Sequence, residues 1–322
     1  YSRGIVRVYD RNEDIRQLAY DSIQSLLRWE NLRLPGKSPY TESGFLYLTD
    51  ENELPDIEKH IQELMEKNYP VDILSGQNLK KLVPWLKDRK GVAGIYEKRG
   101  GYGDPGLTAF NFASGFQEKG GVLFENTETI GIEKDRDRWQ VNLKNGKVTG
   151  RVVLVTTGGW TGTLIPGLPV FARTIPLTQV LKKDWKLDIS VVDEKAKTYM
   201  RPHQGATFYC GSQKHRSATN IDLLDLSSDG VVEDSIERLE KLVDKKRQFA
   251  TLNHMVGYDG YTEQGKPIVQ FIPEEQGLYV AAGMSGLGYK CSIALSKEIA
   301  RQISNYVVKG SSDNPIKWRM PL

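Results

Sequence analysis

The sequence predicts an α/β (α+β) protein built from two interleaved domains. Residues 152–156 form a continuous apolar run rich in valine, which is typical of a strand buried on both faces. Residues 139–143 instead alternate apolar and polar side chains, which is typical of a strand with one face on the core. Because both kinds of strand recur along the 322 residues, we expect domains assembled from separate segments, rather than one domain in each half.

Apolar spacing and turn residues predict the elements of the first part of the chain. Helical spacing is clear between Asp14 and Trp29, and Pro84 is expected to stop a short helix. Residues 5–9 are interpreted as a strand end or an irregular crossing segment. The other predicted elements are strand 44–49, helix 54–67, helix 78–83, strand 92–96, helix 107–119 and strand 122–125.

The middle and the end of the chain are predicted to be richer in strands. The pair Asn145-Gly146 lies between two strand-like runs and is a strong hairpin signal. The predicted elements are strands 129–133, 139–143, 152–156, 171–180, 197–200 and 206–210, helix 231–251, strand 278–282 and a helical pattern from 293 to 303.

The composition argues against several classes of partner and site. A net charge of +3 with interspersed signs argues against nucleic acid, and no apolar run approaches the ~20 residues of a membrane span. The four histidines show no metal-ligand spacing, and the basic run 245–247 is interpreted as a solvated helix face. Two distant cysteines, Cys210 and Cys291, form neither a zinc site nor a disulfide framework, which favours a cytoplasmic protein.

The strongest cofactor signal is the glycine segment that follows residues 278–282. This apolar strand leads into Gly283, Gly286 and Gly288, and a helical pattern follows. A strand, a glycine turn and a helix present backbone N–H groups to a flat or anionic cofactor. Lys290 is unfavourable in a first helical turn, which favours a role facing a cofactor or an anionic substrate.

Two further segments are candidate ligand sites. The dinucleotide fingerprint Gly-x-Gly-x-x-Gly occurs once, over residues 101–106, with Glu125 about twenty residues on. Asp104-Pro105 fits better as a helix N-cap followed by proline, so a nicotinamide-dependent dehydrogenase is only an alternative. The strand 152–156 ends at Gly158-Gly159, which is equally consistent with a ligand site at the sheet edge and with a plain turn.

Taken together, these segments resemble the D-amino-acid oxidase/sarcosine oxidase family of FAD-dependent amine oxidoreductases over nearly the whole chain. The match is most specific at residues 281–290, Ala-Ala-Gly-Met-Ser-Gly-Leu-Gly-Tyr-Lys. Weaker matches occur in the family's order at Ser2–Arg7, Gly103–Pro105, Thr127–Ile130, Val155–Trp160, Tyr199–Pro202 and Gly265–Pro267.

The resemblance implies an incomplete Rossmann-like FAD/NAD(P)-binding domain and a mixed β-sheet substrate domain with flanking helices. The first would comprise residues 1–41, 102–170 and 263–322, and the second residues 42–101 and 171–262. The residues implied to bind FAD are Arg7, Ile130, Thr157, Gly158, Trp160, Gly283, Gly286, Leu287, Gly288, Tyr289 and Lys290.

The chain departs from the family pattern in four ways. The first βαβ unit with its Gly-x-Gly-x-x-Gly turn is absent, so another chain or segment is a possible source of it. Gly257 stands where some members attach FAD to a cysteine, which implies non-covalent FAD. Tyr209 stands where sarcosine oxidases have an oxygen-activating lysine, which favours a dehydrogenase. Asp259 stands where relatives hold the substrate with arginine or tyrosine.

The activity implied by the resemblance is oxidation of the C–N bond of an amine or amino acid, with hydride transfer to flavin N5. Lys290 and Arg7 are the candidate catalytic cations, either beside the reduced flavin or on a substrate carboxylate. Asp259 would hold a substrate ammonium or cap a loop. The remaining alternative is an accessory subunit that binds no flavin.

Overall fold

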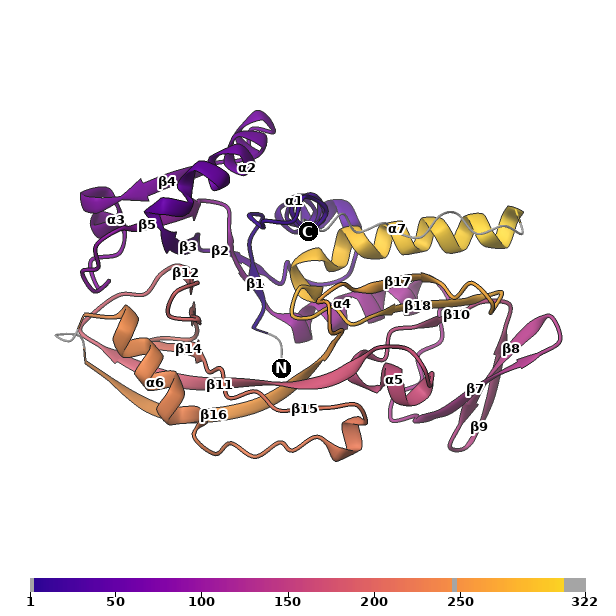
Figure 1. The fold of residues 1–322 in the computed structure, drawn as a ribbon. Coiled ribbons are helices and arrows are strands. Elements are labelled where there is room, and N and C mark those ends of the chain that lie inside the picture. The colour runs from indigo at the N-terminus through magenta and orange to yellow at the C-terminus, as the bar shows by residue number, and fades with distance from the viewer. Residues whose placement is uncertain (1–2, 245–247, 310–322) are drawn as a thin grey trace.

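A computed structural model of the chain describes residues 3–244 and 248–309. These residues form a large mixed sheet, three small sheets and the helices around them (Figure 1). The basic run 245–247 lies outside the described residues. Within the described part of the chain, no helix is long and apolar enough to cross a membrane. No cluster of three or more His, Cys, Asp and Glu residues in this part could hold a metal ion.

The large sheet has nine strands in the described residues, all within residues 42–101 and 171–262, which we call the large-sheet region. Its strands are β3 (Phe45–Asp50), β4 (Val71–Ser75), β5 (Val92–Glu97), β11 (Phe171–Lys183), β12 (Ser190–Asp193), β13 (Thr198–Pro202), β14 (Thr207–Gly211), β15 (Ser217–Ala218) and β16 (Gln248–Tyr261). Their order is β15-β11-β14-β13-β12-β3-β5-β4, and β16 pairs along β11. Strands β11 and β16 form a long antiparallel ladder at the base of the molecule (Figure 1).

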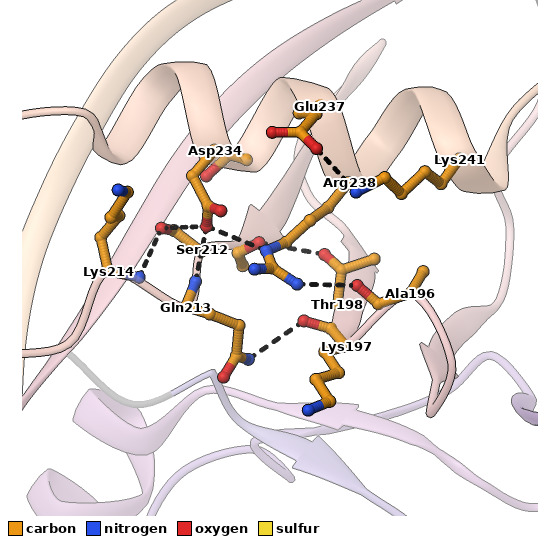
Figure 2. A network of polar contacts seen from close by, with 12 residues as sticks. Ala196, Lys197, Thr198, Ser212, Gln213, Lys214, Asp234, Glu237, Arg238 and Lys241 are labelled. Atoms are coloured by element: carbon orange, nitrogen blue, oxygen red, sulfur yellow. Dashed lines mark hydrogen bonds and ion pairs between the residues drawn. The ribbon is translucent and has the colours of Figure 1, made fainter.

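Helices cover this sheet and close its core. They are η2 (Glu51–Glu53), α2 (Leu54–Glu66), α3 (Gly76–Leu82), η4 (Ile221–Leu223) and α6 (Val231–Leu242). Helix α6 lies on one face of the sheet, where the Thr178 hydroxyl donates to Ser235 Oγ over 2.8 Å. Figure 2 shows the polar network that fixes its start: the Asp234 carboxylate accepts hydrogen bonds from the Ser212 hydroxyl, the Gln213 N–H and Arg238 Nε.

The predicted helix 231–251 is wrong beyond Leu242. The chain turns extended there, because Val243 forms a β-bridge with Leu86 and the Asp244 N–H donates to the Trp85 carbonyl over 2.8 Å. Residues 248–251 then pair with β11 as the start of β16. Long-range pairing therefore overrides the local helical pattern, a common outcome for propensity-based predictions.

The remaining described segments, residues 3–41, 102–170 and 263–309, form what we call the open-sheet region. Its elements are α1 (Glu13–Leu27), η1 (Trp29–Leu32), α4 (Pro105–Glu118), β7 (Thr129–Asp135), β8 (Arg138–Leu143), β9 (Gly146–Gly150), β10 (Val153–Val155), η3 (Gly158–Trp160), α5 (Thr161–Leu164), β17 (Ile268–Phe271), β18 (Leu278–Ala282) and α7 (Gly288–Lys309). The strands form the sheets β7-β8-β9 and β10-β18-β17. The predicted hairpin is confirmed, since Leu143 pairs with Gly146.

The predicted strand 152–156 forms as β10 but is not buried on both faces, and the predicted strand 122–125 is wrong. Strand β10 pairs in parallel with β18, but no other described strand pairs with its second edge. Leu154 in β10 is therefore 42% exposed instead of buried on both faces. The predicted strand 122–125 does not form, and the side chains of Val122 and Phe124 are exposed. A strand needs a neighbour for its backbone hydrogen bonds, and none is described here.

A small sheet and a buried carboxylate join the two regions. The sheet contains β1 (Ile5–Val6), β6 (Gly101–Gly103) and β2 (Tyr40–Glu42) in that order. Beside it, fully buried Glu97 accepts hydrogen bonds from the N–H groups of Val8 and Tyr9 and from the Tyr69 hydroxyl. Burial raises the pKa of Glu97, while these hydrogen bonds oppose the shift. The hydrogen bonds from Val8 and Tyr9 to Glu97 thus hold the N-terminal segment against the large-sheet region.

Candidate functional site

A cavity of about 1220 Å³ lies where five segments of the described chain meet. It exceeds the roughly 300–1,000 Å³ of ordinary small-molecule sites. The lining comes from residues 127–130, from the end of β10 with the turn and α5 after it, from Asp222 of η4, from residues 258–260 of β16, and from the end of β18 with the first turns of α7. The cavity thus contacts both the open-sheet and the large-sheet regions.

The turn between β18 and α7 forms one wall of this cavity. Gly283 and Gly286 adopt φ angles of +68° and +82°, which L-residues with a side chain rarely adopt. Helix α7 then begins at Gly288, which also lines the cavity. The first N–H groups of a helix lack intrahelical partners and carry partial positive charge, so this wall favours an electron-rich or anionic group.

The end of β10, which pairs in parallel with β18, forms the neighbouring part of the lining. Thr157 and Gly158 lead into η3, and the two threonine hydroxyls of Thr157 and Thr161 lie 3.1 Å apart. The indole of Trp160 is 45% exposed and stands edge-on to Tyr258, with 5.3 Å between ring centroids. An exposed aromatic ring beside threonine hydroxyls suits a flat heteroaromatic ligand.

The structure brings most of the predicted site residues together at the cavity. Nine of them belong to its lining: Ile130, Thr157, Gly158, Trp160, Asp259, Gly283, Gly286, Gly288 and Tyr289. Three others, Arg7, Leu287 and Lys290, are not part of that lining. Leu287 packs instead against a cluster formed by Ile15, Ala19 and Cys291.

The two predicted catalytic cations are engaged by an internal carboxylate. Lys290 is 5% exposed, and its ammonium lies 2.7 Å from the Asp10 carboxylate. Arg7 lies 3.5 Å from the same carboxylate and also donates to the Tyr9 carbonyl. Burial and the charge of Arg7 lower the pKa of Lys290, while Asp10 opposes the shift. The structure thus gives Lys290 and Arg7 an ion pair with Asp10 instead of a position facing the cavity.

Asp259 lies in the cavity lining on β16, directly opposite Arg173 of β11. Burial raises the pKa of its carboxyl group, and the positive charge of Arg3 partly opposes this shift. Keeping a buried carboxylate charged costs free energy, and a neighbouring cation offsets that cost. The position therefore suits a ligand ammonium.

The fingerprint at residues 101–106 lacks the geometry of a dinucleotide-binding turn. Gly101–Gly103 is the antiparallel strand β6, paired with β1 and β2, whereas the fingerprint requires a parallel strand that leads into the turn. The Asp104 side chain accepts from the Leu107 N–H over 3.0 Å, which confirms the predicted N-cap of α4. Gly103 also packs against the Tyr289 hydroxyl, where no side chain would fit.

Sequence reasoning missed one face of α7 in the cavity lining. Its residues are Ser292, Leu295, Ser296 and Ile299. Their i, i+3, i+4, i+7 spacing places them on one face of the helix. In the sequence, the two apolar residues were identified only as part of the helical pattern from 293 to 303. The two serines among them were the available signal that this face was not entirely core.

Comparisons with known proteins agree on the fold. The family model described as DAO, FAD dependent oxidoreductase, matches residues 2–302. L-Proline dehydrogenase from P. horikoshii superposes with a TM-score of 0.81 and 19% identity over 97% of this chain and 84% of that chain. Glycine oxidase from Geobacillus kaustophilus gives 0.77 and 21% over 97% and 84%. L-Amino acid deaminase from Proteus vulgaris gives 0.77 and 15% over 98% and 85%. No curated protein matches the chain.

Proposed function

Since this chain belongs to the family of FAD-dependent oxidoreductases, we propose that it oxidises the C–N bond of an amine or amino acid with bound FAD. Membership confirms the resemblance to the D-amino-acid oxidase/sarcosine oxidase family and the α+β fold class. The observation that carries the proposal is that nine of the predicted site residues line one and the same cavity. The solved structures named above act on amino acids, which supports the same substrate class here.

The residues present fit the flavin. The N-terminus of α7 offers N–H groups without intrahelical partners, and Trp160 and Thr157 offer an aromatic face and a hydroxyl. We assign the binding of FAD to Ile130, Thr157, Gly158, Trp160, Gly283, Gly286, Gly288 and Tyr289. Gly257 has no side chain that could form a covalent bond, which supports non-covalent FAD.

Bound flavin would supply the hydride acceptor. The chain's own contribution is to hold and orient the substrate and to manage its proton. We propose that Asp259 holds the substrate ammonium and accepts a proton at its carboxylate, because its raised pKa makes protonation easier. The positive end of the α7 dipole would stabilise negative charge on the ligand. Lys290 and Arg7 would then support the site indirectly, through Asp10.

A dehydrogenase is the better proposal than an oxidase. Tyr209 occupies the position where the sarcosine oxidases carry a lysine, and its hydroxyl lies 3.3 Å from His203 Nε2. The two free cysteines are buried, which is compatible with the cytoplasmic location that we propose.

The unpaired edge of β10 favours a second polypeptide segment beside it. Leu154 of β10 is exposed and offers apolar surface there. We propose that a βαβ unit, from the same polypeptide or from another chain, completes the FAD site there. This edge is also the observation that favours the second candidate function, a binding subunit without flavin.

The test is flavin uptake followed by reduction. We expect the protein to bind added FAD and show a flavin spectrum, and amino acids to bleach this spectrum under anaerobic conditions. Gly286→Ala should weaken FAD uptake, because Gly286 lines the cavity with φ +82°. Gly265→Ala is the matched control, since Gly265 has φ +67° but lies outside that lining. A colourless protein that takes up no FAD would contradict the enzyme and favour the binding subunit.

A further inference from the structure

The lining of the large cavity contains carboxylates but, within the described residues, no lysine, arginine or histidine. The acidic residues of the lining are Glu128, Asp222 and Asp259. Bound FAD would add the negative charge of its phosphate groups, which the start of α7 offsets by about half an elementary charge. A cavity lined by charges of one sign attracts ligands of the opposite sign. The lining therefore favours a positively charged substrate.

Two of these three carboxylates are available for a ligand cation. Glu128 lies 3.8 Å from Lys144 Nζ and is therefore already neutralised by the chain. Asp222 and Asp259 form no ion pair among the described residues, although the charge of Arg3 acts on Asp259 from further away. Since we assign Asp259 to the reacting nitrogen of the substrate, Asp222 remains for a second cationic group.

Asp222 belongs to η4, a short helical turn that is held on both sides. The side-chain oxygen of Asn220 accepts a hydrogen bond from the Asp222 N–H over 2.9 Å, and Ile221 is buried in a small apolar cluster. Beyond η4, Arg216 forms an ion pair of 2.7 Å with Asp225. The Asp225 carboxylate is thus neutralised within the chain and lies outside the cavity lining, whereas Asp222 lines the cavity.

The half-buried ring of Tyr258 lies beside η4 and lines the same cavity. It packs against the apolar cluster that contains Ile221, the residue before Asp222. Trp160 stands edge-on to Tyr258, with an angle of 80° between the ring planes, and this contact restrains the orientation of the tyrosine ring. The π-system of a tyrosine attracts a nearby cation.

Asp222 and Tyr258 therefore offer a carboxylate and an aromatic ring in one part of the lining. An ammonium or guanidinium group gains Coulombic attraction from the first and cation–π attraction from the second. An uncharged alkyl group gains neither of these attractions. This part of the cavity thus distinguishes substrates by the charge of a group other than the reacting nitrogen.

We propose that Asp222 and Tyr258 bind a second cationic group of the substrate, so that the substrate carries two basic nitrogens, as a diamine or a basic amino acid does. This inference rests on the proposed function and narrows its substrate class. Asp259 holds the nitrogen that is oxidised, while Asp222 and Tyr258 hold the other one. The substrate is thereby oriented at both of its nitrogens.

The experiment compares two pairs of ligands that differ only in a terminal ammonium: cadaverine with pentylamine, and L-lysine with L-norleucine. Ligand-observed NMR measures binding to the FAD-loaded protein and to the protein alone, so it needs no turnover. In at least one pair, we expect wild-type protein to bind the compound with the extra ammonium about tenfold more tightly. The pair that shows this preference distinguishes a diamine from a basic amino acid.

Variants then assign this preference to the two residues. Asp222→Asn and Tyr258→Leu should each reduce it roughly three- to tenfold, whereas Tyr258→Phe should keep it, because the aromatic ring remains. Asp229→Asn is the matched control, since exposed Asp229 follows η4 in the same segment but lies outside the lining. It should leave the preference unaltered.

Two results would overturn the inference: wild-type protein with no preference in either pair, or a preference that Asp222→Asn keeps while the variant remains folded by circular dichroism. A preference that depends on Asp222, in a protein that takes up no FAD, would instead support binding of the second cation and contradict the proposed function.

Discussion

The large-sheet and open-sheet regions contain apolar strands of similar sequence that differ in the number of neighbouring strands and in burial. Leu46 of β3 lies between β12 and β5 and is fully buried. Leu154 of β10 has a neighbouring strand on one side only in the described residues and is 42% exposed. The local sequence around each is a strand-forming run. The difference shows that an apolar run does not determine by itself whether a strand is buried, because burial depends on the segments around that strand.

The largest expected effect comes from the same substitution made in both strands. Leu46→Ala should lower the free energy of unfolding by about 3–4 kcal/mol, because it leaves a cavity in a closed core. Leu154→Ala should lower it by less than about 1 kcal/mol, because its side chain is already partly in water. Urea unfolding followed by circular dichroism measures both. Equal losses would mean that Leu154 is covered in solution, and the comparison would fail.

The next prediction tests whether interactions in the open-sheet region contribute little to stability everywhere or only at the edge formed by β10. Asp10→Asn should cost roughly 3 kcal/mol, because it leaves the buried Lys290 ammonium and Arg7 without their common carboxylate. Asp21→Asn on the surface of α1 is the control and should cost less than about 0.5 kcal/mol. Thermal unfolding measures the two variants side by side. If Asp10→Asn left the thermal stability unchanged, the ion pair would not hold α7, and Lys290 would again be available for a ligand.

The sequence indicated the residues that line the cavity better than it indicated how the strands around them pair. The glycines at 283, 286 and 288 and the turn after β10 were found because backbone freedom and turn chemistry are local properties. The strand 122–125 and the buried character of 152–156 were wrong because both depend on neighbouring strands, which local patterns do not reveal. The prediction of a helix up to residue 251 was wrong for the same reason, since residues 248–251 pair with β11.

The charged residues show where sequence reasoning ends. Lys290 looked available because its helix position is unfavourable, but the structure pairs it with Asp10, 280 positions away. In the sequence, Arg201 stands out only as part of the family match at Tyr199–Pro202. Its lack of a carboxylate became visible only when the ladder β13-β14-β11 showed which side chains surround it. Pairing between distant charges is a property of the folded chain.

A smaller effect concerns the polar network that closes the large-sheet region (Figure 2). Although burial alone would raise it, hydrogen bonds from Arg238, Ser212 and Gln213 lower the pKa of Asp234 to about 2. The carboxylate therefore stabilises the fold above the ordinary aspartate pKa of ~3.9, and this contribution is lost as the pH falls towards 2. Asp234→Asn should cost about 1.5 kcal/mol at pH 6.

The measurement is urea unfolding of wild type and Asp234→Asn between pH 6 and pH 3. The gap between the two proteins should shrink as the pH falls through this range, because below pH ~3.9 the unfolded wild-type carboxyl group takes up a proton while the folded carboxylate, with a pKa of about 2, stays ionised. Asp229→Asn is the control, since Asp229 precedes α6 but lies outside the network. A gap that stays constant with pH would show that the network does not depend on the charge of Asp234.

The smallest expected effect on stability is that of Phe124→Ser, which tests whether the apolar segment 122–124 is exposed in solution. Phe124 is 59% exposed and follows two further exposed apolar residues, Val122 and Leu123. Replacing it should change the free energy of unfolding by less than about 0.5 kcal/mol, because little apolar area is buried there. It should still reduce binding of a hydrophobic dye and self-association, since exposed apolar patches promote both. Dye fluorescence and analytical ultracentrifugation, with the exposed Lys119→Ser as control, measure this. A loss of several kcal/mol would show that residues 122–124 pack against another segment in solution, and the open-sheet region would then be closed like the large sheet.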